Sequence, residues 1–174
     1  AAAREAFNDS GLNLSDEDPN RIGVYVGSGI GGIGMVEDEC EVMRTRGHRR
    51  VTPYFIPRVI PNMAPGVVSI DLGLKGPNSC VTTACATGTH ALGDAAAIIR
   101  KGDAVAMVAG GTESCITPLA MAGFGNMRAL TERNDDPKKA SCPFDKRRDG
   151  FIMAEGAGIV VLEALQRVNQ ELGT

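Results

Sequence analysis

The sequence predicts an α/β fold that is built around a parallel β-sheet. Residues 22–27 form an apolar run that is typical of a buried strand. Residues 78–111 contain a β-prone segment, an amphipathic helix and a second apolar run, which is the order of a βαβ unit with parallel strands. Glycine contributes 22 of the 174 residues, about 13% against a usual ~7%, and small residues suit the close helix–sheet contacts of layered folds.

The segment before residue 78 shows helix and strand signals that are separated by glycine and proline. Gly11 ends an N-terminal amphipathic helix, and an acidic loop follows it. Prolines recur every fourth residue between 53 and 65, which disfavours a regular strand and would break a long helix. The expected elements are a helix over 1–9, a strand over 22–27, a helix from the glycine cluster to about 46, and a helix over about 62–72.

The βαβ unit carries the clearest signals. A short β-prone segment over 79–84 precedes a helix over 86–101, which Gly102 ends, and an apolar strand follows over 104–109. Since these strands are joined by a helix, we expect them to be parallel. The small and apolar residues of the helix fall on one face and form a continuous stripe at Gly88, Ala91, Leu92, Ala95, Ala96 and Ile99.

The remaining segment predicts loops with a short helix near 118–124. A strand over 158–163 then leads into a final polar helix. No repeat or low-complexity linker interrupts the chain, so residues 1–174 are expected to form a single domain. The chain begins without Met inside a predicted helix, which indicates a truncated domain.

Composition and charge disfavour several classes of protein. The formal net charge of −3 provides no basic surface for nucleic acid, and no run approaches the ~18 apolar residues of a membrane-spanning helix. The first residues lack the basic head and apolar run of a signal peptide, so no secretory leader is expected. Five cysteines without a CxxC pair predict free thiols in a reducing compartment, and no metal site.

The glycine cluster after the first strand matches the GxGxxG pattern of dinucleotide-binding turns at Gly27, Gly29 and Gly32. A dinucleotide-binding fold also needs an acidic residue about 20 positions further on, at the end of a second strand. The corresponding region, residues 50–54, contains a proline and no acid. We therefore favour a close-packed turn beside a pocket over a nucleotide-binding domain, which remains the alternative.

Cys85 is the candidate nucleophile. It lies at the predicted junction of the 79–84 strand and the 86–101 helix, where α/β enzymes commonly mount a nucleophile. Unpaired N–H groups and the positive end of the helix dipole favour the thiolate there and can stabilise an oxyanion. Position alone leaves a buried structural thiol as the alternative. The other cysteines lack this placement and are interpreted as structural: Cys40, Cys80, Cys115 and Cys142.

The two histidines are weak candidates for the base that a nucleophilic thiol needs. His90 follows Cys85 by five residues, about 500° of helical rotation, so a packed helix residue is favoured. His48 lies within a basic run and is expected to be solvated. This run is either a solvated face or a docking patch for an acidic partner, and it comprises Arg44, Arg46, Arg49 and Arg50.

The segment around Cys85, residues 83–90 (TACATGTH), resembles the nucleophile segment of β-ketoacyl-acyl-carrier-protein synthases, the condensing enzymes of fatty acid synthesis. Other motifs resemble the same family in the same order, and the elongating type II enzymes of bacteria and organelles are the most similar. Each motif is weak alone, but the ordered set spans nearly the whole chain. These motifs are Gly27–Gly32, Pro53–Pro57, Asn62-Met63, Gly76-Pro77, Met107–Gly111, Gly123–Gly125, Arg128–Leu130, Pro143–Asp145 and Arg148–Phe151.

The resemblance implies the thiolase fold, an α/β fold whose two similar halves stack as α-β-α-β-α layers. This chain would form mainly the N-terminal half, incomplete at both ends. The resemblance also implies a reaction in which a cysteine accepts an acyl chain from acyl carrier protein as a thioester. Decarboxylation of malonyl-carrier protein then gives a carbanion that attacks this thioester and forms a 3-oxoacyl chain. No cofactor is implied, since phosphopantetheine arrives on the carrier protein.

The resemblance also implies roles for individual residues. Cys85 matches the acylated nucleophile, and its backbone N–H matches one donor of the oxyanion hole. Ile30 and Phe124 match walls of the acyl pocket, and Phe55 matches a pocket residue that is contributed across a homodimer interface. The residues implied to dock the acidic carrier protein are Arg128, near the phosphopantetheine entrance, and Arg46 and Arg49 in the basic run.

The family's two catalytic histidines, a lysine and a second oxyanion N–H match nothing in this chain, and neither His48 nor His90 corresponds to them. We therefore expect the 174 residues alone to be unable to decarboxylate malonyl thioester. The alternative is a non-catalytic relative that sets chain length or assembles with a partner, although such relatives typically lose the nucleophile. A degradative thiolase would share the fold, but the motifs fit the carrier-dependent branch better. The bacterial cytoplasm is the default location, and a mitochondrion or plastid stays open.

Overall fold

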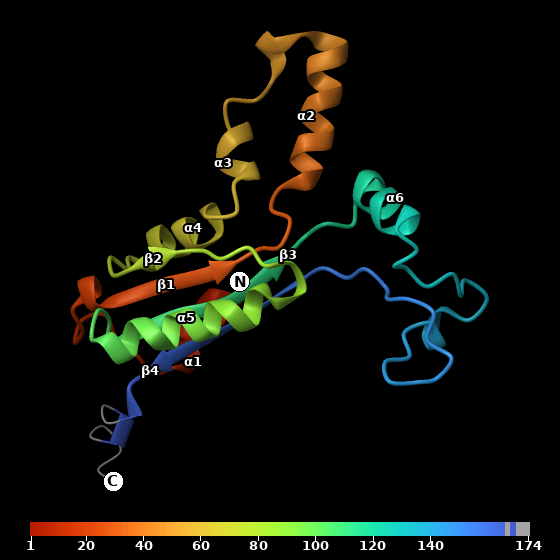
Figure 1. Cartoon of the computed structure of the whole chain (residues 1–174). Coiled ribbons are helices and arrows are strands. Elements are labelled where there is room, and N and C mark those ends of the chain that lie inside the picture. The colour runs from red at the N-terminus through yellow and green to blue at the C-terminus, as the bar shows by residue number, and fades with distance from the viewer. Residues whose placement is uncertain (166–167, 170–174) are drawn as a thin grey trace. The chain divides into compact units, whose positions relative to one another are not determined.

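The computed structural model describes residues 1–165 and 168–169 (Figure 1). The chain divides into two compact units. The polar helix predicted after residue 163 lies largely outside the described residues. The first unit consists of residues 1–31, 60–113 and 156 onward, and the second consists of residues 32–59 and 114–155.

A four-stranded sheet in the order β2-β1-β3-β4 forms the centre of the first unit. The strands are β1 (Ile22–Gly27), β2 (Asn78–Ser79), β3 (Ala106–Glu113) and β4 (Gly156–Glu163). β1 pairs in parallel with both β2 and β3, which confirms the predicted parallel arrangement. β4 pairs antiparallel with β3, so the sheet is mixed.

The predicted βαβ unit is present, with β1 between its two strands. The helix α5 (Thr87–Lys101) joins β2 to β3 and begins after the short 3₁₀ turn η3 (Ala84–Ala86). The expected strand over 79–84 is wrong, because only Asn78 and Ser79 pair with β1. The β-branched residues that follow leave the sheet, since the backbone N–H of Thr83 donates to the Thr87 hydroxyl at 2.8 Å.

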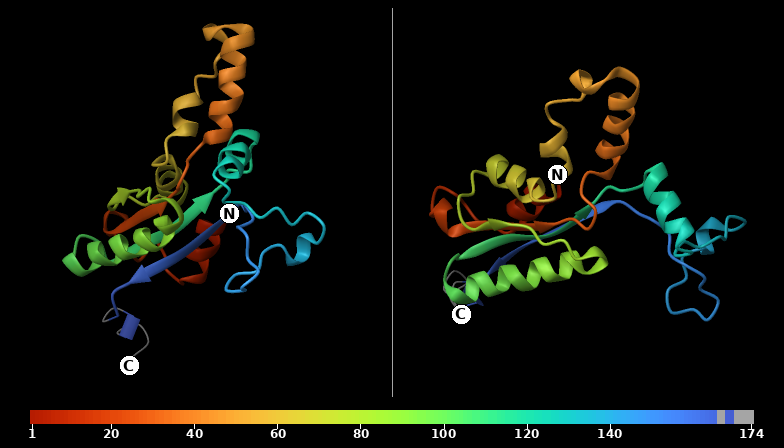
Figure 2. Two further views of the ribbon diagram at one scale, coloured as in Figure 1. Left: turned by 45° about the vertical axis from the view of Figure 1, so that its right-hand side comes forward. Right: turned by 45° about the horizontal axis from the view of Figure 1, so that its top comes forward.

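Helices cover both faces of this sheet, as the views in Figure 2 show. The helices α1 (Ala2–Asp9) and α4 (Met63–Leu72) lie on one face, where Phe7 and Val108 belong to one apolar cluster. α5 covers the other face, where Ala95 packs with Met107. Because successive strand residues point to opposite faces, the apolar run Ala106–Ala109 of β3 serves both clusters. Burying one such side chain stabilises the fold by about 1.5–3 kcal/mol.

The apolar stripe predicted for α5 is confirmed. Ala91 and Ala95 are fully buried, and the half-buried Leu92 and Ile99 pack beside Ala95. Gly102 ends the helix in the left-handed conformation (φ 82°), and its N–H donates to the carbonyls of the preceding turn. This glycine end, predicted from sequence, is the usual way in which a helix satisfies its last carbonyl groups.

The second unit contains short helices and a long loop. Gly47 ends its longest helix with φ 82°, and the Thr117 hydroxyl caps another by accepting from the N–H of Ala120. The elements of this unit are α2 (Ile33–Arg46), η2 (His48–Arg50), α3 (Phe55–Val59), α6 (Pro118–Asn126) and η4 (Pro137–Lys139), while η1 (Pro19–Arg21) precedes β1 in the first unit.

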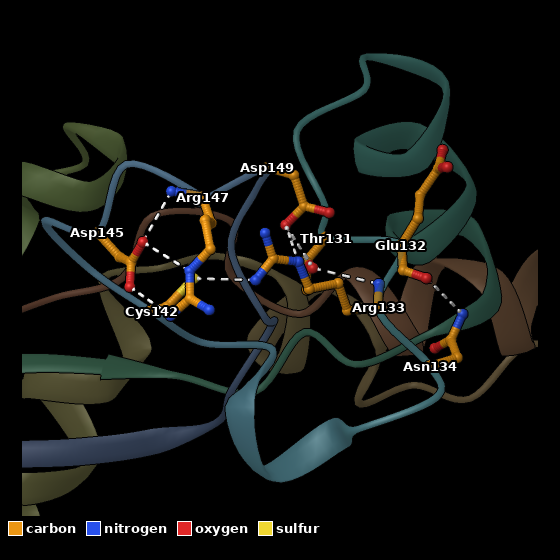
Figure 3. Close-up of polar contacts among 8 residues, drawn as sticks. All are labelled: Thr131, Glu132, Arg133, Asn134, Cys142, Asp145, Arg147 and Asp149. Carbon is orange, nitrogen blue, oxygen red and sulfur yellow. Dashed lines mark hydrogen bonds and ion pairs between the residues drawn. The ribbon is translucent and has the colours of Figure 1, made fainter.

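Polar contacts order the loop that follows α6 (Figure 3). The hydroxyl of Thr131 donates to Asp149 at 2.8 Å, and the Arg133 guanidinium lies 3.5 Å from the same carboxylate. Further along the loop, Arg147 donates to Asp145 through both its side chain and its backbone N–H. These bonds hold the pKa of the Asp145 carboxyl at about 2, with the side-chain bond as the larger cause.

Candidate active site

Cys85 lies in η3, directly before the first turn of α5. Its side chain is exposed and its thiol is free, whereas Cys115 is buried. The preceding residue, Ala84, has a φ of +50°, a left-handed conformation that non-glycine residues rarely adopt. A sharp reversal of this kind is typical of functional turns. The exposed thiol therefore fits a reactive cysteine better than the buried structural thiol that sequence position left open.

Two side chains of α5 hold the segment before Cys85. The Thr87 hydroxyl accepts from the backbone N–H of Thr83 at 2.8 Å, and Thr87 itself is only 4% exposed. The Nδ1 atom of His90 lies 2.8 Å from the Thr83 hydroxyl. His90 is exposed and not the packed helix residue that we expected. Its contact fixes the turn that carries Cys85.

The N-terminus of α5 provides hydrogen-bond donors at the turn that contains Cys85. α5 is 15 residues long, and the positive end of its dipole lies at the turn that contains Cys85. The first N–H groups of a helix lack partners within the helix. They can stabilise the oxyanion that forms when sulfur attacks a carbonyl carbon.

The end of β1 and the glycine turn that follows it pack closely against this segment. A Cβ atom on Gly27 would lie 2.5 Å from the carbonyl oxygen of Val81 and closer still to the Thr87 methyl group. A Cβ atom on Gly29 would lie 2.8 Å from a Glu113 oxygen and 3.3 Å from the Ala84 carbonyl oxygen. Close packing explains both glycines, as the sequence predicted. Ile30, in the same turn, is 36% exposed.

Glu113 is a residue of this site that sequence reasoning missed. It ends β3, and its carboxylate accepts hydrogen bonds at 2.8 Å from the Ser28 hydroxyl and from the N–H of Gly29. Its position at the carboxyl end of a parallel strand is the one signal that could have identified it, because functional groups of open α/β sheets gather there.

The second unit carries the other predicted site residues. Phe55 begins α3, and Phe124 in α6 is half-buried, with its ring edge-on to Phe151 at 5.5 Å between centroids. Arg128 follows α6, is exposed and has a φ of +56°. The structure thus brings Phe124 into contact with Phe151. From the sequence, Phe151 was known only as the last residue of the motif Arg148–Phe151.

The predicted docking residues Arg46 and Arg49 lie at one end of α2. Arg46 is the last residue of that helix, Arg49 lies in η2, and both are exposed. Arg44 pairs with Glu41, whereas neither Arg46 nor Arg49 forms an ion pair within residues 1–165. Cations at a helix C-terminus also complement the helix dipole, so a structural role accounts for part of this pattern.

Within the part of the chain that the structure describes, no three side chains of His, Cys, Asp or Glu gather in a group that could hold a metal ion. None of the helices in that part combines the length and the apolar character required to span a bilayer.

Solved structures identify the class of fold. One chain of the AntDE:AntF complex, a type II PKS acyl-carrier protein with its ketosynthase, matches 98% of this chain and 43% of its own length, with a TM-score of 0.90 and 33% identity. A β-ketoacyl synthase from Burkholderia phymatum matches 99% of this chain and 42% of its own length, with a TM-score of 0.87 and 32% identity. The protein is therefore an α/β protein with the thiolase fold of ketosynthases.

Sequence comparison then defines the family. Residues 1–167 match the model of the β-ketoacyl synthase N-terminal domain, so the chain belongs to this family. The 3-oxoacyl-[acyl-carrier-protein] synthase 2 of Vibrio cholerae is 53% identical over 163 residues, which are 94% of this chain and 39% of the relative. The enzyme of that name from Coxiella burnetii is 50% identical over 173 residues, 99% of this chain and 42% of the relative. The chain spans about two-fifths of the length of these relatives.

Proposed function

We propose that the protein is a 3-oxoacyl-acyl-carrier-protein synthase of fatty acid synthesis, with Cys85 as the residue that accepts the acyl chain. The observation that carries this proposal is the placement of an exposed, free thiol at the N-terminus of α5, on a turn that the hydrogen bond from Thr83 to Thr87 stabilises. Relatives at 50–53% identity that bear this enzyme's name support it.

The first step is an exchange of thioesters. The Cys85 thiolate attacks the carbonyl carbon of an acyl chain that is bound to phosphopantetheine on acyl carrier protein. A carbon–sulfur bond to Cys85 forms, and the bond to phosphopantetheine breaks, so that its thiol leaves with a proton. The N–H of Cys85 donates to the oxyanion that exists between these two events.

The second step forms the carbon–carbon bond. Malonyl-carrier protein loses CO₂, and the resulting carbanion attacks the acyl carbonyl on Cys85, which releases the Cys85 thiolate and a 3-oxoacyl chain two carbons longer. The two histidines and the lysine that the family uses here have no counterpart in residues 1–174. His90 is bonded to Thr83, and His48 lies in η2 of the other unit. Residues 1–174 alone should therefore not decarboxylate malonyl thioester, and a condensation rate from this chain alone would contradict that.

The remaining residues of the site receive the following roles in this proposal. Ile30, Phe55 and Phe124 contact the acyl chain, and Phe55 does so across a homodimer interface. The phosphopantetheine arm comes with the carrier protein, so no resident cofactor is required. The AntDE:AntF relative, an acyl-carrier protein in complex with its ketosynthase, supports this kind of partner. The cationic residues that bind the acidic carrier protein are Arg46, Arg49 and Arg128.

A condensation assay tests the proposed function. The complete protein that carries this sequence is mixed with acyl-carrier protein loaded with an acyl chain and with malonyl-carrier protein, and the products are analysed by mass spectrometry. We expect a 3-oxoacyl product two carbons longer. The product should disappear in Cys85→Ser and persist in Cys80→Ser, since Cys80 is a half-buried thiol five residues away. A product that forms equally well in Cys85→Ser would contradict the proposal.

A non-catalytic ketosynthase-like subunit, which sets chain length or assembles with a partner, is the second candidate. A solved ishigamide ketosynthase/chain length factor matches 99% of this chain with a TM-score of 0.85 and 29% identity. The presence of Cys85 favours the catalytic role. The same assay separates the two, because a non-catalytic subunit would give no product by itself. We place the protein in the bacterial cytoplasm because the relatives are bacterial, with a mitochondrion or plastid as the alternative.

A further inference from the structure

We propose that Glu113 is a positioning residue, whose carboxylate holds the glycine turn that carries Ile30 against the turn that carries Cys85. This inference rests on the proposed function and adds the residue that fixes the geometry of the site. Glu113 is half-buried at the end of β3, and it and its hydrogen-bond partners Ser28 and Gly29 belong to the first unit.

The two oxygens of Glu113 bind two consecutive residues of the turn. One oxygen accepts from the Ser28 hydroxyl and the other from the N–H of Gly29, both at 2.8 Å. The parallel register places Gly27 opposite Gly111, so Glu113 extends two residues beyond that pair and faces the segment after β1. Hydrogen bonds to an ionised carboxylate are roughly twice as strong as those between neutral groups. The carboxylate thus ties the end of β3 to the turn that follows β1.

Ser28 links the Glu113 carboxylate to Gly31, the residue that follows Ile30. Its hydroxyl donates to Glu113 and also accepts from the N–H of Gly31 at 2.9 Å. Ser28 is 7% exposed, so a lost partner would leave a buried polar group unsatisfied. Ile30 is 36% exposed and is therefore only partly held by packing. Its direction depends on the backbone on both sides, which the Glu113 carboxylate orders.

The same turn lies against the residue that precedes the nucleophile. The Cβ position of Gly29 is 2.8 Å from Glu113 Oε2 and 3.3 Å from the carbonyl oxygen of Ala84. The Gly29 backbone is therefore held between the carboxylate and the strained Ala84, whose φ is +50°. Because Ala84 is bonded to Cys85, a shift of the glycine turn changes the support of the nucleophile. Both oxygens of Glu113 are already engaged, so its role is positioning and not proton transfer.

The test compares three variants of the complete protein. Glu113→Ala removes both acceptors, whereas Glu113→Gln can still accept from the N–H of Gly29 but cannot accept from Ser28 at the same time. Asp18→Ala is the matched control, because the Asp18 carboxylate also accepts two hydrogen bonds in the same unit, from Asn20, but at the opposite end of β1. The readouts are the melting temperature, the rate of Cys85 acylation, and the ratio of rates for long and short acyl chains.

We expect Glu113→Ala to slow acylation about tenfold to a hundredfold, since a misplacement of about 1 Å can cost about a hundredfold in rate. It should also change the ratio for long and short chains, because Ile30 is no longer fixed. In the acylation rate and in the chain-length ratio, Glu113→Gln should fall between Glu113→Ala and the unmodified protein. Asp18→Ala should match the unmodified protein in the same two readouts.

A purely structural role would lower the melting temperature without changing the chain-length ratio, and that result in Glu113→Ala would overturn the inference. If Glu113→Ala fails to fold, the chain-length ratio of Glu113→Gln distinguishes a positioning role from a purely structural one. A changed ratio at an unchanged melting temperature supports the positioning role, and an unchanged ratio refutes it. Absence of any acyl group on Cys85 of the unmodified protein would instead refute the proposed function, and the inference with it.

Discussion

Replacing Gly27 by alanine tests the packing that supports the Cys85 turn. A Cβ atom there would lie 2.5 Å from the Val81 carbonyl oxygen and closer still to the Thr87 methyl group. Non-bonded atoms prefer about 3.5–4.0 Å, so the overlap with the Val81 oxygen is about 1–1.5 Å. Thr87 is 4% exposed and its hydroxyl accepts from Thr83, so it cannot move aside without breaking that bond.

The two effects of this change can be summed. Overpacking costs about 1–3 kcal/mol, and a lost hydrogen bond adds about 1 kcal/mol. Gly27→Ala should therefore destabilise the protein by about 2–4 kcal/mol. Gly93→Ala is the matched control, because Gly93 lies inside α5 with open space around its Cβ position. Alanine there should stabilise the helix by up to about 1 kcal/mol.

Thermal unfolding of the complete protein measures both changes. One kcal/mol shifts the melting temperature by about 2–4 °C in a domain of 150–250 residues and by less in a longer protein, so Gly27→Ala should melt lower by up to about 16 °C. Acylation of Cys85 should also slow in Gly27→Ala, since Thr87 holds Thr83 and thereby the Cys85 turn. If Gly27→Ala melts at or above the temperature of Gly93→Ala, the packing described here is incorrect.

Two further predictions concern the second unit. Replacing Arg46 and Arg49 by glutamate reverses their charge and should weaken binding of acyl carrier protein about two- to tenfold at low salt, and less at high salt. Titration calorimetry measures this affinity. An equal loss of affinity in Lys101→Glu would contradict specific docking. The pKa of the Asp145 carboxyl, about 2, should rise toward 3.8 in Arg147→Ala by carbon NMR. Because this pKa is depressed, the Asp145–Arg147 contact is fully present above about pH 4 and is lost as the pH falls through about 2. An unchanged midpoint in Arg147→Ala would refute this cause.

Much of the first unit could be predicted from the sequence because its signals are local. The apolar stripe of α5 and the run in β1 appear within single windows of the chain, and Gly102 marks a helix end by its own conformation. The antiparallel direction of β4 has no such signal. Its residues are as apolar as those of a parallel strand, and only pairing with β3 shows the direction.

Two local signals were misleading because tertiary contacts override them. The β-branched residues before Ala84 predicted a strand, but the bond from Thr83 to Thr87 turns that segment away from the sheet. The apolar strand predicted over 104–109 ends too early, because β3 continues through Gly110 and Gly111, which pair with β4.

The candidate site was only partly accessible from the sequence. Cys85 could be singled out because a helix start and a cysteine are adjacent in the chain. Glu113 could not, because its partners Ser28 and Gly29 are 85 and 84 residues away and meet it only through the register of β1 and β3. Contacts of that separation depend on the folded sheet, and no window of the sequence contains both partners.

Peptide-resolved mass spectrometry tests the role of Cys85 most directly. The complete protein is incubated with acyl-loaded carrier protein alone, so that a thioester accumulates without a second substrate. We expect the mass of the acyl chain on the peptide that contains Cys85, its persistence in Cys80→Ser, and its loss in Cys85→Ser. An acyl adduct that survives in Cys85→Ser, or one that maps to Cys80, would contradict the assignment of Cys85 as the nucleophile.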